Sequence, residues 1–190
     1  MAQVDRLRAD SLLVASPSLV CPFFARSLVL LIDHSEEGAF GLVVNRATGL
    51  SLADVVEDVG ILRRDEVRSS VPVMVGGPVA ADAGFVILER SGDAPADATP
   101  VGRSLAISAS TRVLSSVARG EVGGRAMLCL GYAGWGPGQL DKEAREGSWI
   151  PCDVAVDLVL GMSPEERWET ALRNMGIEPG LFDGRVVASA

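Results

Sequence analysis

Short apolar segments alternate along the chain with clusters of glycine, proline, aspartate and serine. Segments of this length, rich in valine, leucine and isoleucine and bounded by turn residues, are typical of β-strands. The pattern predicts strands at residues 11–16, 26–33, 39–45, 71–75, 84–89, 104–108, 125–133 and 149–154. The residues HSEEG (34–38) predict a hairpin connection, and Pro151 predicts that the last strand lies at a sheet edge or carries a bulge.

Other segments carry apolar residues at helical spacing between capping residues. They predict helices at residues 51–60, 111–120 and 163–176. Ser51 and Asp54 form a capping-box pattern at the start of the first helix. Residues 91–102, rich in proline, aspartate, glycine and alanine, predict a surface loop. Strands joined by hairpins, with helices set apart from them, indicate a single α+β domain over residues 1–190.

The length of the apolar segments bears on the cellular location of the protein. Apolar side chains make up 48% of the residues, enough for a substantial core. The longest uninterrupted apolar run, residues 28–32, is far too short to cross a bilayer. Residues 1–18 contain two arginines and a brief apolar patch broken by Pro17, unlike a secretory leader. These features predict a cytoplasmic protein with no membrane association.

The charge balance limits the class of partner. The net charge is −8 and the pI is about 4.7. The 17 basic residues are outnumbered by 25 acidic ones and form no run. DNA-binding proteins draw much of their affinity from lysine and arginine contacts to phosphates. Direct nucleic-acid binding, and with it a direct transcription factor, is therefore disfavoured.

The cysteines and the single histidine exclude several kinds of site. Cys21, Cys129 and Cys152 are scattered and form no CxxC pair. One histidine cannot complete a zinc site of ordinary spacing, so reduced thiols and no metal are expected. Catalysis by imidazole would require His34 beside a serine or Cys21, oriented by an acid such as Asp33. The chain has no GxSxG nucleophile elbow, and a hydrogen-bonded turn residue is the favoured role for this histidine.

The stretch GYAGWGPGQLDKE (131–143) places closely spaced glycines before a charged, helix-prone run. One interpretation is structural. Gly136 caps a helix that starts at Pro137, and Trp135 packs on Leu140 as a hydrophobic staple.

The same interpretation supplies the polar contacts of that helix. The side chain of Gln139 reaches back to the amide of the cap residue. Pairs of opposite charge then stand four residues apart, Asp141 with Arg145 and Lys142 with Glu146. Each side chain has a structural role, and no ligand is required.

A second interpretation makes the same corner a ligand site. A strand that ends in glycines and leads into a helix offers free amide donors to an anion. Gln139 and Glu143 share one face of that helix, but the spacing matches neither the dinucleotide fingerprint nor the P-loop. GGPV (76–79) poses a similar choice between a turn and a cleft wall. The structural interpretation is favoured, and the two are compatible.

The chain resembles the YqgE/AlgH family of bacterial proteins over almost its whole length. The resemblance is carried by LLVASPSL (12–19), F-x-R-S-L-V-L-L-I-D-H (24–34), GAFGLVVNRAT (38–48), GGPV (76–79) and GYAGWGPGQLDKE (131–143), followed by Trp149. It implies a single α+β domain with a bifurcated, partly barrel-like mixed sheet surrounded by helices. One branch of the family has a name linked to transcriptional regulation of alginate production, which does not establish DNA binding.

The chain departs from the family pattern at three places. Cys21-Pro22 stands where the family usually has Asp-Pro, Ala47 replaces a proline, and Glu89 replaces a common histidine. A catalytic role for any of these positions in the family would be impaired here, which weakens an enzymatic interpretation.

These observations lead to two hypotheses. In the first, the protein is a non-enzymatic regulatory protein that binds a small ligand or a partner protein, with no cofactor. Its cleft is predicted from residues that supply donors, close backbone approach, a stacking face and an acceptor: Arg26, His34, Asn45, Arg46, Gly76, Gly77, Trp135, Gln139 and Glu143. We call these the predicted cleft residues. In the second, a small-molecule hydrolase or transferase uses Glu143 as general base, assisted by His34 or Cys21 in a shared cleft.

Overall fold

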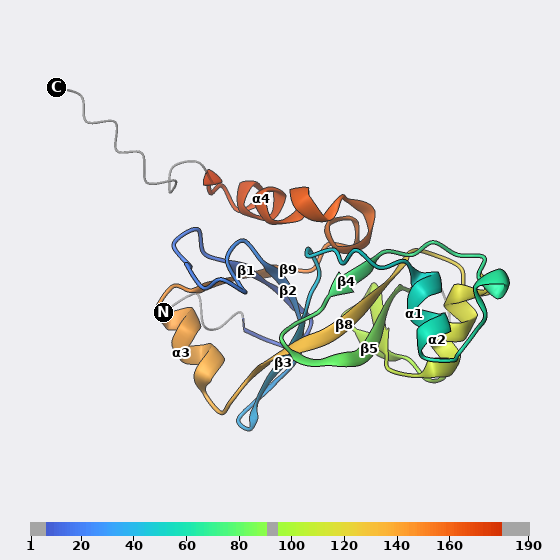
Figure 1. Ribbon diagram of the computed structural model, residues 1–190. Coiled ribbons are helices and arrows are strands. Elements are labelled where there is room, and N and C mark those ends of the chain that lie inside the picture. Colours follow the sequence, from blue (N-terminus) through green and yellow to red (C-terminus); the bar gives the residue numbers. More distant parts are fainter. Residues whose placement is uncertain (1–6, 91–94, 180–190) are drawn as a thin grey trace.

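A computed structural model describes residues 7–90 and 95–179 of the protein (Figure 1). The start of the N-terminal segment considered above as a leader lies outside these ranges. A single sheet of nine strands forms the centre of the domain. Its strands are β1 Ser11–Ala15, β2 Leu28–Ser35, β3 Gly38–Val43, β4 Val73–Val75, β5 Val79–Glu89, β6 Thr99–Val101, β7 Leu105–Ser108, β8 Ala126–Trp135 and β9 Trp149–Asp153.

The strand order is β6-β7-β5-β8-β3-β2-β1-β9, and β4 pairs with β8 off this path. The pairing of β4 with β8 is parallel, and the other pairings are antiparallel. Short turns join β2 to β3 and β6 to β7, as antiparallel neighbours allow, whereas β8 and β9 pair with strands that are distant along the chain. The predicted edge position of the strand that contains Pro151 is confirmed, since β9 pairs with β1 at the end of the order.

The long strand β8 makes the sheet bifurcate. Its last residues, Ala133 to Trp135, pair with β3, whereas Leu128 to Leu130 pair with β5 on one side and β4 on the other. The sheet curls into a half barrel with helices around it, which confirms the fold expected from the resemblance.

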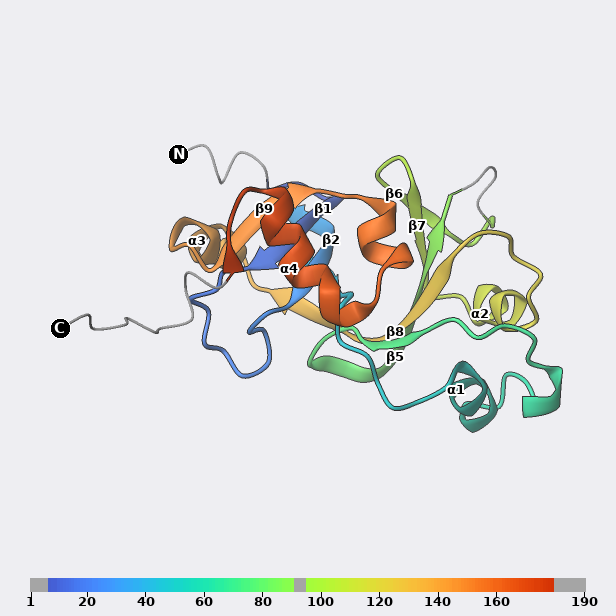
Figure 2. The same ribbon diagram turned by 90° about the horizontal axis from the view of Figure 1, so that it is seen from above.

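The helices pack at the two ends of the sheet (Figure 2). They are α1 Leu52–Asp58, α2 Thr111–Ala118, α3 Gln139–Arg145 and α4 Pro164–Asn174, with a 3₁₀ turn at Arg64–Glu66 and a π-helical turn at Asp157–Gly161. Helix α4 lies over β1, β2 and β9, while α1 and α2 lie together at the opposite end. Within the described ranges, every helix is too short or too polar to cross a membrane.

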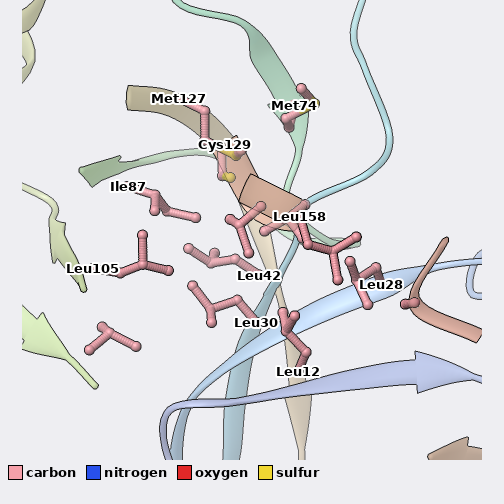
Figure 3. Close-up of a cluster of buried hydrophobic side chains, with 14 of the residues drawn as sticks. Leu12, Leu28, Leu30, Leu42, Met74, Ile87, Leu105, Met127, Cys129 and Leu158 are labelled. Carbon is pink, nitrogen blue, oxygen red and sulfur yellow. The ribbon is translucent and has the colours of Figure 1, made fainter. Parts of the chain in front are cut away.

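The core divides into clusters on the two faces of the sheet. The largest gathers leucine, isoleucine and methionine side chains from the strands and from the π-helical turn (Figure 3): Leu12, Leu28, Leu30, Leu42, Met74, Ile87, Leu105, Met127 and Leu158. A second cluster lies beneath α3 and contains Trp135, Leu140 and Trp149. A third lies between the sheet and α1 and α2, and includes Val55, Leu114 and Leu128.

The capping predictions meet different outcomes. The capping box of Ser51 and Asp54 is confirmed, with the Ser51 hydroxyl accepting from the Asp54 amide at 3.1 Å. The predicted cap Gly136 is wrong, because α3 begins at Gln139 with Gly138 at the cap position. Gly138 has φ +68°, a left-handed conformation that turns the chain before the helix starts.

Two further predictions are corrected. The loop predicted at 91–102 contains a strand, because Thr99–Val101 pairs with β7 through a hairpin; residues 91–94 lie outside the described ranges. Of the predicted pairs along α3, Lys142 contacts Glu146 at 3.9 Å. Among the described residues, Asp141 forms no ion pair with Arg145, and its Oδ2 lies 3.1 Å from Nε2 of His34 instead.

Candidate functional site

The carboxylate of Glu143 lies at the centre of a hydrogen-bonded corner, which we call the α3 corner. It comprises Trp135, Gly136, Gln139, Glu143 and Trp149. The Oε2 atom of Glu143 accepts hydrogen bonds from the indole Nε1 of Trp135 at 3.0 Å and of Trp149 at 2.8 Å. Its Oε1 accepts from the Gln139 amide at 2.8 Å, and Gln139 Oε1 accepts from the Gly136 amide at 3.0 Å.

Aromatic packing holds this corner against the sheet. Both indoles are buried, and their rings meet edge to face with centroids 5.8 Å apart. Phe24 packs on both of them, with its ring 5.6 Å from Trp149. Since buried indole N–H groups need acceptors, the carboxylate satisfies donors that the core would otherwise leave unpaired. The contacts support the structural interpretation of this stretch, and both oxygens of Glu143 are occupied.

His34 is placed beside α3 but binds a different carboxylate. Its Nε2 lies 3.1 Å from Oδ2 of Asp141, and its side chain is 17% exposed. Among the described residues, no hydrogen bond or ion pair joins the His34 side chain to Glu143 or to Cys21. Joint action of Glu143 with His34 or Cys21 in a shared cleft stays a prediction.

Arg26, just before β2, contacts α4, and Asn45, just after β3, holds the backbone of this segment. The Arg26 guanidinium lies 4.6 Å from the centroid of the Trp168 ring and donates to Glu169 at 2.7 Å. Asn45 accepts from the amide of Leu28 at 2.7 Å and donates to the carbonyl of Arg26 at 2.9 Å. These contacts stabilise a left-handed backbone at Arg26, whose φ is +59°.

Arg46 belongs to another contact group. Its guanidinium lies 5.0 Å from the centroid of the Phe23 ring, which in turn packs on Phe24. The carbonyl of Arg46 accepts from the Val75 amide, and the amide of Thr48 donates to Val73. Ala47 lies opposite Met74 in this short antiparallel bridge, but its amide donates no hydrogen bond to it. Alanine and proline, which has no amide hydrogen, are therefore equally compatible with the bridge.

Gly76 and Gly77 are required by close backbone packing. A Cβ on Gly76 would overlap the carbonyl of Gly131, and one on Gly77 would overlap the carbonyl of Tyr132. Gly76 donates to the carbonyl of Leu130 and accepts from the amide of Val43, both at 2.7 Å. The glycines therefore seat the end of β4 against β8.

The predicted cleft residues thus fall into separate contact groups. Trp135, Gln139 and Glu143 form the α3 corner, with His34 next to it through Asp141. Arg26 contacts α4, Asn45 bonds to the backbone of Arg26, and the two glycines pack on β8. Their role as one binding surface stays a prediction.

The structure also contains an open groove that the sequence did not indicate. It has a volume of about 750 Å³ and lies between α1, α2 and the strands β5 and β8. Val86, Leu128 and Leu130 line its sheet side, with Val55 and Leu114 on the helices. None of the predicted cleft residues lines it. We call it the α1–α2 groove.

Carboxylates dominate the polar residues of the α1–α2 groove. Asp54 and Glu57 share the guanidinium of Arg64. The Ser51 hydroxyl and amide, together with Arg64, lower the pKa of Asp54 to about 2. Asp58 and Asp82 are exposed, and neither has an ion-pair partner among the described residues.

Small residues of β5 keep the groove open. The run AADAG (80–84) contains no large side chain, and the pairing of β5 with β8 is interrupted between Val79 and Gly84. Val59 is 56% exposed and Leu50 is 51% exposed, and both line the groove. The small run of β5 was the available signal in the sequence.

The thiols of Cys129 and Cys152 are not poised for nucleophilic chemistry. Burial raises the pKa of Cys129 to about 12. Burial, together with the nearby Asp153, raises the pKa of Cys152 to about 11. Among the described residues, no three His, Cys, Asp or Glu side chains gather where they could hold a metal ion.

Comparison with known proteins places the chain in a family. The AlgH-like family model matches residues 12–180. A UPF0301 protein of Anaeromyxobacter sp. is 42% identical over 182 residues, which cover 92% of this chain and 91% of that protein. A UPF0301 protein of Thioalkalivibrio sulfidiphilus is 34% identical over 175 residues, which cover 92% of this chain and 93% of that protein.

Solved structures agree with this assignment. The solution structure of the AlgH protein from Pseudomonas aeruginosa matches with a TM-score of 0.73 and 34% identity, over 95% of both chains. A crystal structure from Corynebacterium diphtheriae has the same fold, with a TM-score of 0.73, 22% identity, and coverage of 92% and 91%. The resemblance seen in the sequence motifs is confirmed: this chain belongs to the AlgH-like family.

Proposed function

We propose that this protein is a non-enzymatic binding protein that acts through the α1–α2 groove. The observation that carries the proposal is the groove itself, an open and largely apolar concavity of about 750 Å³. Concave apolar surfaces with a few polar groups at the rim are the usual form of binding sites. The large exposed side chains Leu50 and Val59 extend the apolar surface at its mouth.

The enzymatic alternative has less support. A general base needs a carboxylate that can reach a substrate, and both oxygens of Glu143 accept hydrogen bonds from neighbouring side chains. A thiol nucleophile needs a lowered pKa, and burial raises those of Cys129 and Cys152.

A regulatory role, as the name of one branch of the family suggests, would be exerted in the cytoplasm through a bound partner. The net charge of −8 and the carboxylates around the groove oppose contact with nucleic acid. We therefore place any effect on transcription downstream of partner binding.

A thermal-shift screen of small apolar and cationic compounds tests the proposal. A compound at 100 times its dissociation constant stabilises the fold by about 2.7 kcal/mol, a readily measured change in Tm. Gly84→Val fills the groove, and Gln139→Ala alters the exposed surface of the α3 corner. Stabilisation lost in Gly84→Val and kept in Gln139→Ala supports the groove. The reverse pattern would restore the predicted cleft residues as the site. Turnover of any stabilising compound would contradict the non-enzymatic assignment.

A further inference from the structure

The α1–α2 groove has a floor whose backbone is already paired on both sides. Val86 pairs with Leu128 on one side and with Ser108 on the other. Leu130 likewise pairs with Gly84 and with Val75. A bound segment can therefore gain few main-chain hydrogen bonds from this floor and must be recognised through side chains.

The walls of the groove fit a helix better than a strand. Helices α1 and α2 cover the same face of the sheet, where Val55 and Leu114 pack in one cluster with Leu128. The groove is lined by residues of both helices and of β5 and β8. A further helix packed there would bury apolar side chains at positions i, i+3, i+4 and i+7.

Gly84 permits close approach at the floor. A Cβ built on it would lie 3.6 Å from Cδ1 of Leu128, an ordinary contact, and its φ lies outside the left-handed range. Glycine at this position is therefore not required by the fold. Because Gly84 has no side chain, space is left above the sheet. The small methyl group of Ala81 also leaves space in the groove.

The charges of the groove select a basic partner. Asp58 and Asp82 have no ion pair among the described residues, whereas Asp54 and Glu57 are partly neutralised by Arg64. Glu57 and Asp58 also stand in the last turn of α1, which contains no basic residue. The C-terminal end of a helix carries partial negative charge, so cations are attracted there.

Resting on the proposed function, we infer that the groove binds an amphipathic helix of a partner protein, with apolar residues on one face and lysine or arginine facing Asp58 and Asp82. Burial of the apolar side chains of the floor against the partner helix supplies affinity. The carboxylates of Asp58 and Asp82 supply selectivity and faster association.

The test selects peptides on the full-length protein. A random 14-residue peptide library is panned against wild type, after removal of peptides that bind Gly84→Val. Ala81→Trp, which fills the groove from an exposed position, serves as a second filled variant. Enriched peptides are expected to show apolar residues at helical spacing together with lysine or arginine.

Affinities of the enriched peptides are then compared among charge variants. Asp58→Asn with Asp82→Asn is expected to weaken binding about fivefold, a change equivalent to two exposed ion pairs. Glu36→Gln with Glu37→Gln, in the β2–β3 hairpin, changes the net charge equally and is the matched control. It is expected to leave the affinity within about twofold, since screening limits remote charges.

Several outcomes would overturn the inference. Equal losses in both charge variants would show attraction to net charge alone. Apolar residues enriched at alternate positions would indicate strand addition at β5, whose residues 80–83 have no ladder partner among the described residues. Sedimentation showing a dimer that Gly84→Val dissociates would make a second copy of the chain the occupant.

The two proposals fail separately. If no peptide is enriched over the filled variants, yet a small compound stabilises wild type and not Gly84→Val, the helical partner is excluded and the groove stands as a binding site. If neither peptides nor compounds distinguish wild type from Gly84→Val, both are excluded.

Discussion

The indole of Trp149 donates a hydrogen bond to the carboxylate of Glu143 at 2.8 Å, across six residues of chain that include the end of α3. The same oxygen accepts from Trp135 at the end of β8. One side chain thus connects a strand end, a helix and the edge strand β9. The hydrogen bonds of Trp135, Gln139 and Glu143 therefore give the stretch GYAGWGPGQLDKE (131–143) a structural role.

Glu143→Gln should destabilise the fold by about 1–3 kcal/mol, because a glutamine offers one acceptor oxygen to donors that now use two. The change in the free energy of unfolding can be measured by urea titration. Glu146→Gln, at the exposed C-cap of α3, is the matched control and should change stability by less than about 0.5 kcal/mol. Equal stability of the two variants would contradict the structural role of Glu143.

Gly77→Ala should destabilise the protein by about 3 kcal/mol, since a Cβ at this position overlaps the backbone of β8 and cannot be relieved by a side-chain rotation. Gly49→Ala is the control, because a Cβ there meets nothing within 4 Å. Its expected effect is neutral or stabilising by up to about 1 kcal/mol, through the unfolded state. Thermal and urea unfolding of both variants would show the difference, and a stable Gly77→Ala would refute the close packing.

Cys129 and Cys152 should resist alkylation at pH 8 in the native protein. Burial raises the pKa of Cys129 to about 12, so its reactive thiolate is scarce at that pH, and its sulfur is buried. All three thiols should react in urea. Mass spectrometry of iodoacetamide-labelled peptides, with and without urea, assigns the rates. Labelling of Cys129 at the same rate in both conditions would contradict its burial.

Acid should remove the stabilisation supplied by Glu89. Hydrogen bonds from the Arg125 side chain lower the pKa of Glu89 to about 2, with Nε and Nη2 each 2.9 Å from the carboxylate. A lowered pKa stabilises the folded state above the unfolded value near 4.5 and loses that effect as the pH falls toward 2. Glu89→Gln should therefore be less stable than wild type at pH 7, and the gap in urea midpoint should narrow between pH 5 and pH 2. A gap that does not depend on pH would contradict this ion pair.

The sequence predicted what short-range chemistry determines. The capping box of Ser51 and Asp54 and the end position of the Pro151 strand depend on neighbouring residues, and both were read correctly. The start of α3 was misplaced because Gly136 and Gly138 are equally plausible caps until the turn between them is known.

Long-range contacts were beyond such reasoning. Asp141 was matched with Arg145 one helical turn away, but the fold brings His34 to it from 107 residues away. The α1–α2 groove requires α1, the AADAG run and β8 to meet. Its signal, a small-residue run in a strand, gains meaning only when the facing elements are known.

Binding of a helix in the α1–α2 groove is tested most directly by an NMR titration of the full-length, ¹⁵N-labelled protein with the tightest peptide from the panning. We expect chemical-shift changes within residues 54–61, 81–86, 108–114 and 128–130, the segments that contribute most of the residues lining the groove. We also expect Gly84→Val to abolish these changes at the same peptide concentration. Changes centred instead on His34 and the α3 corner, and retained in Gly84→Val, would contradict it.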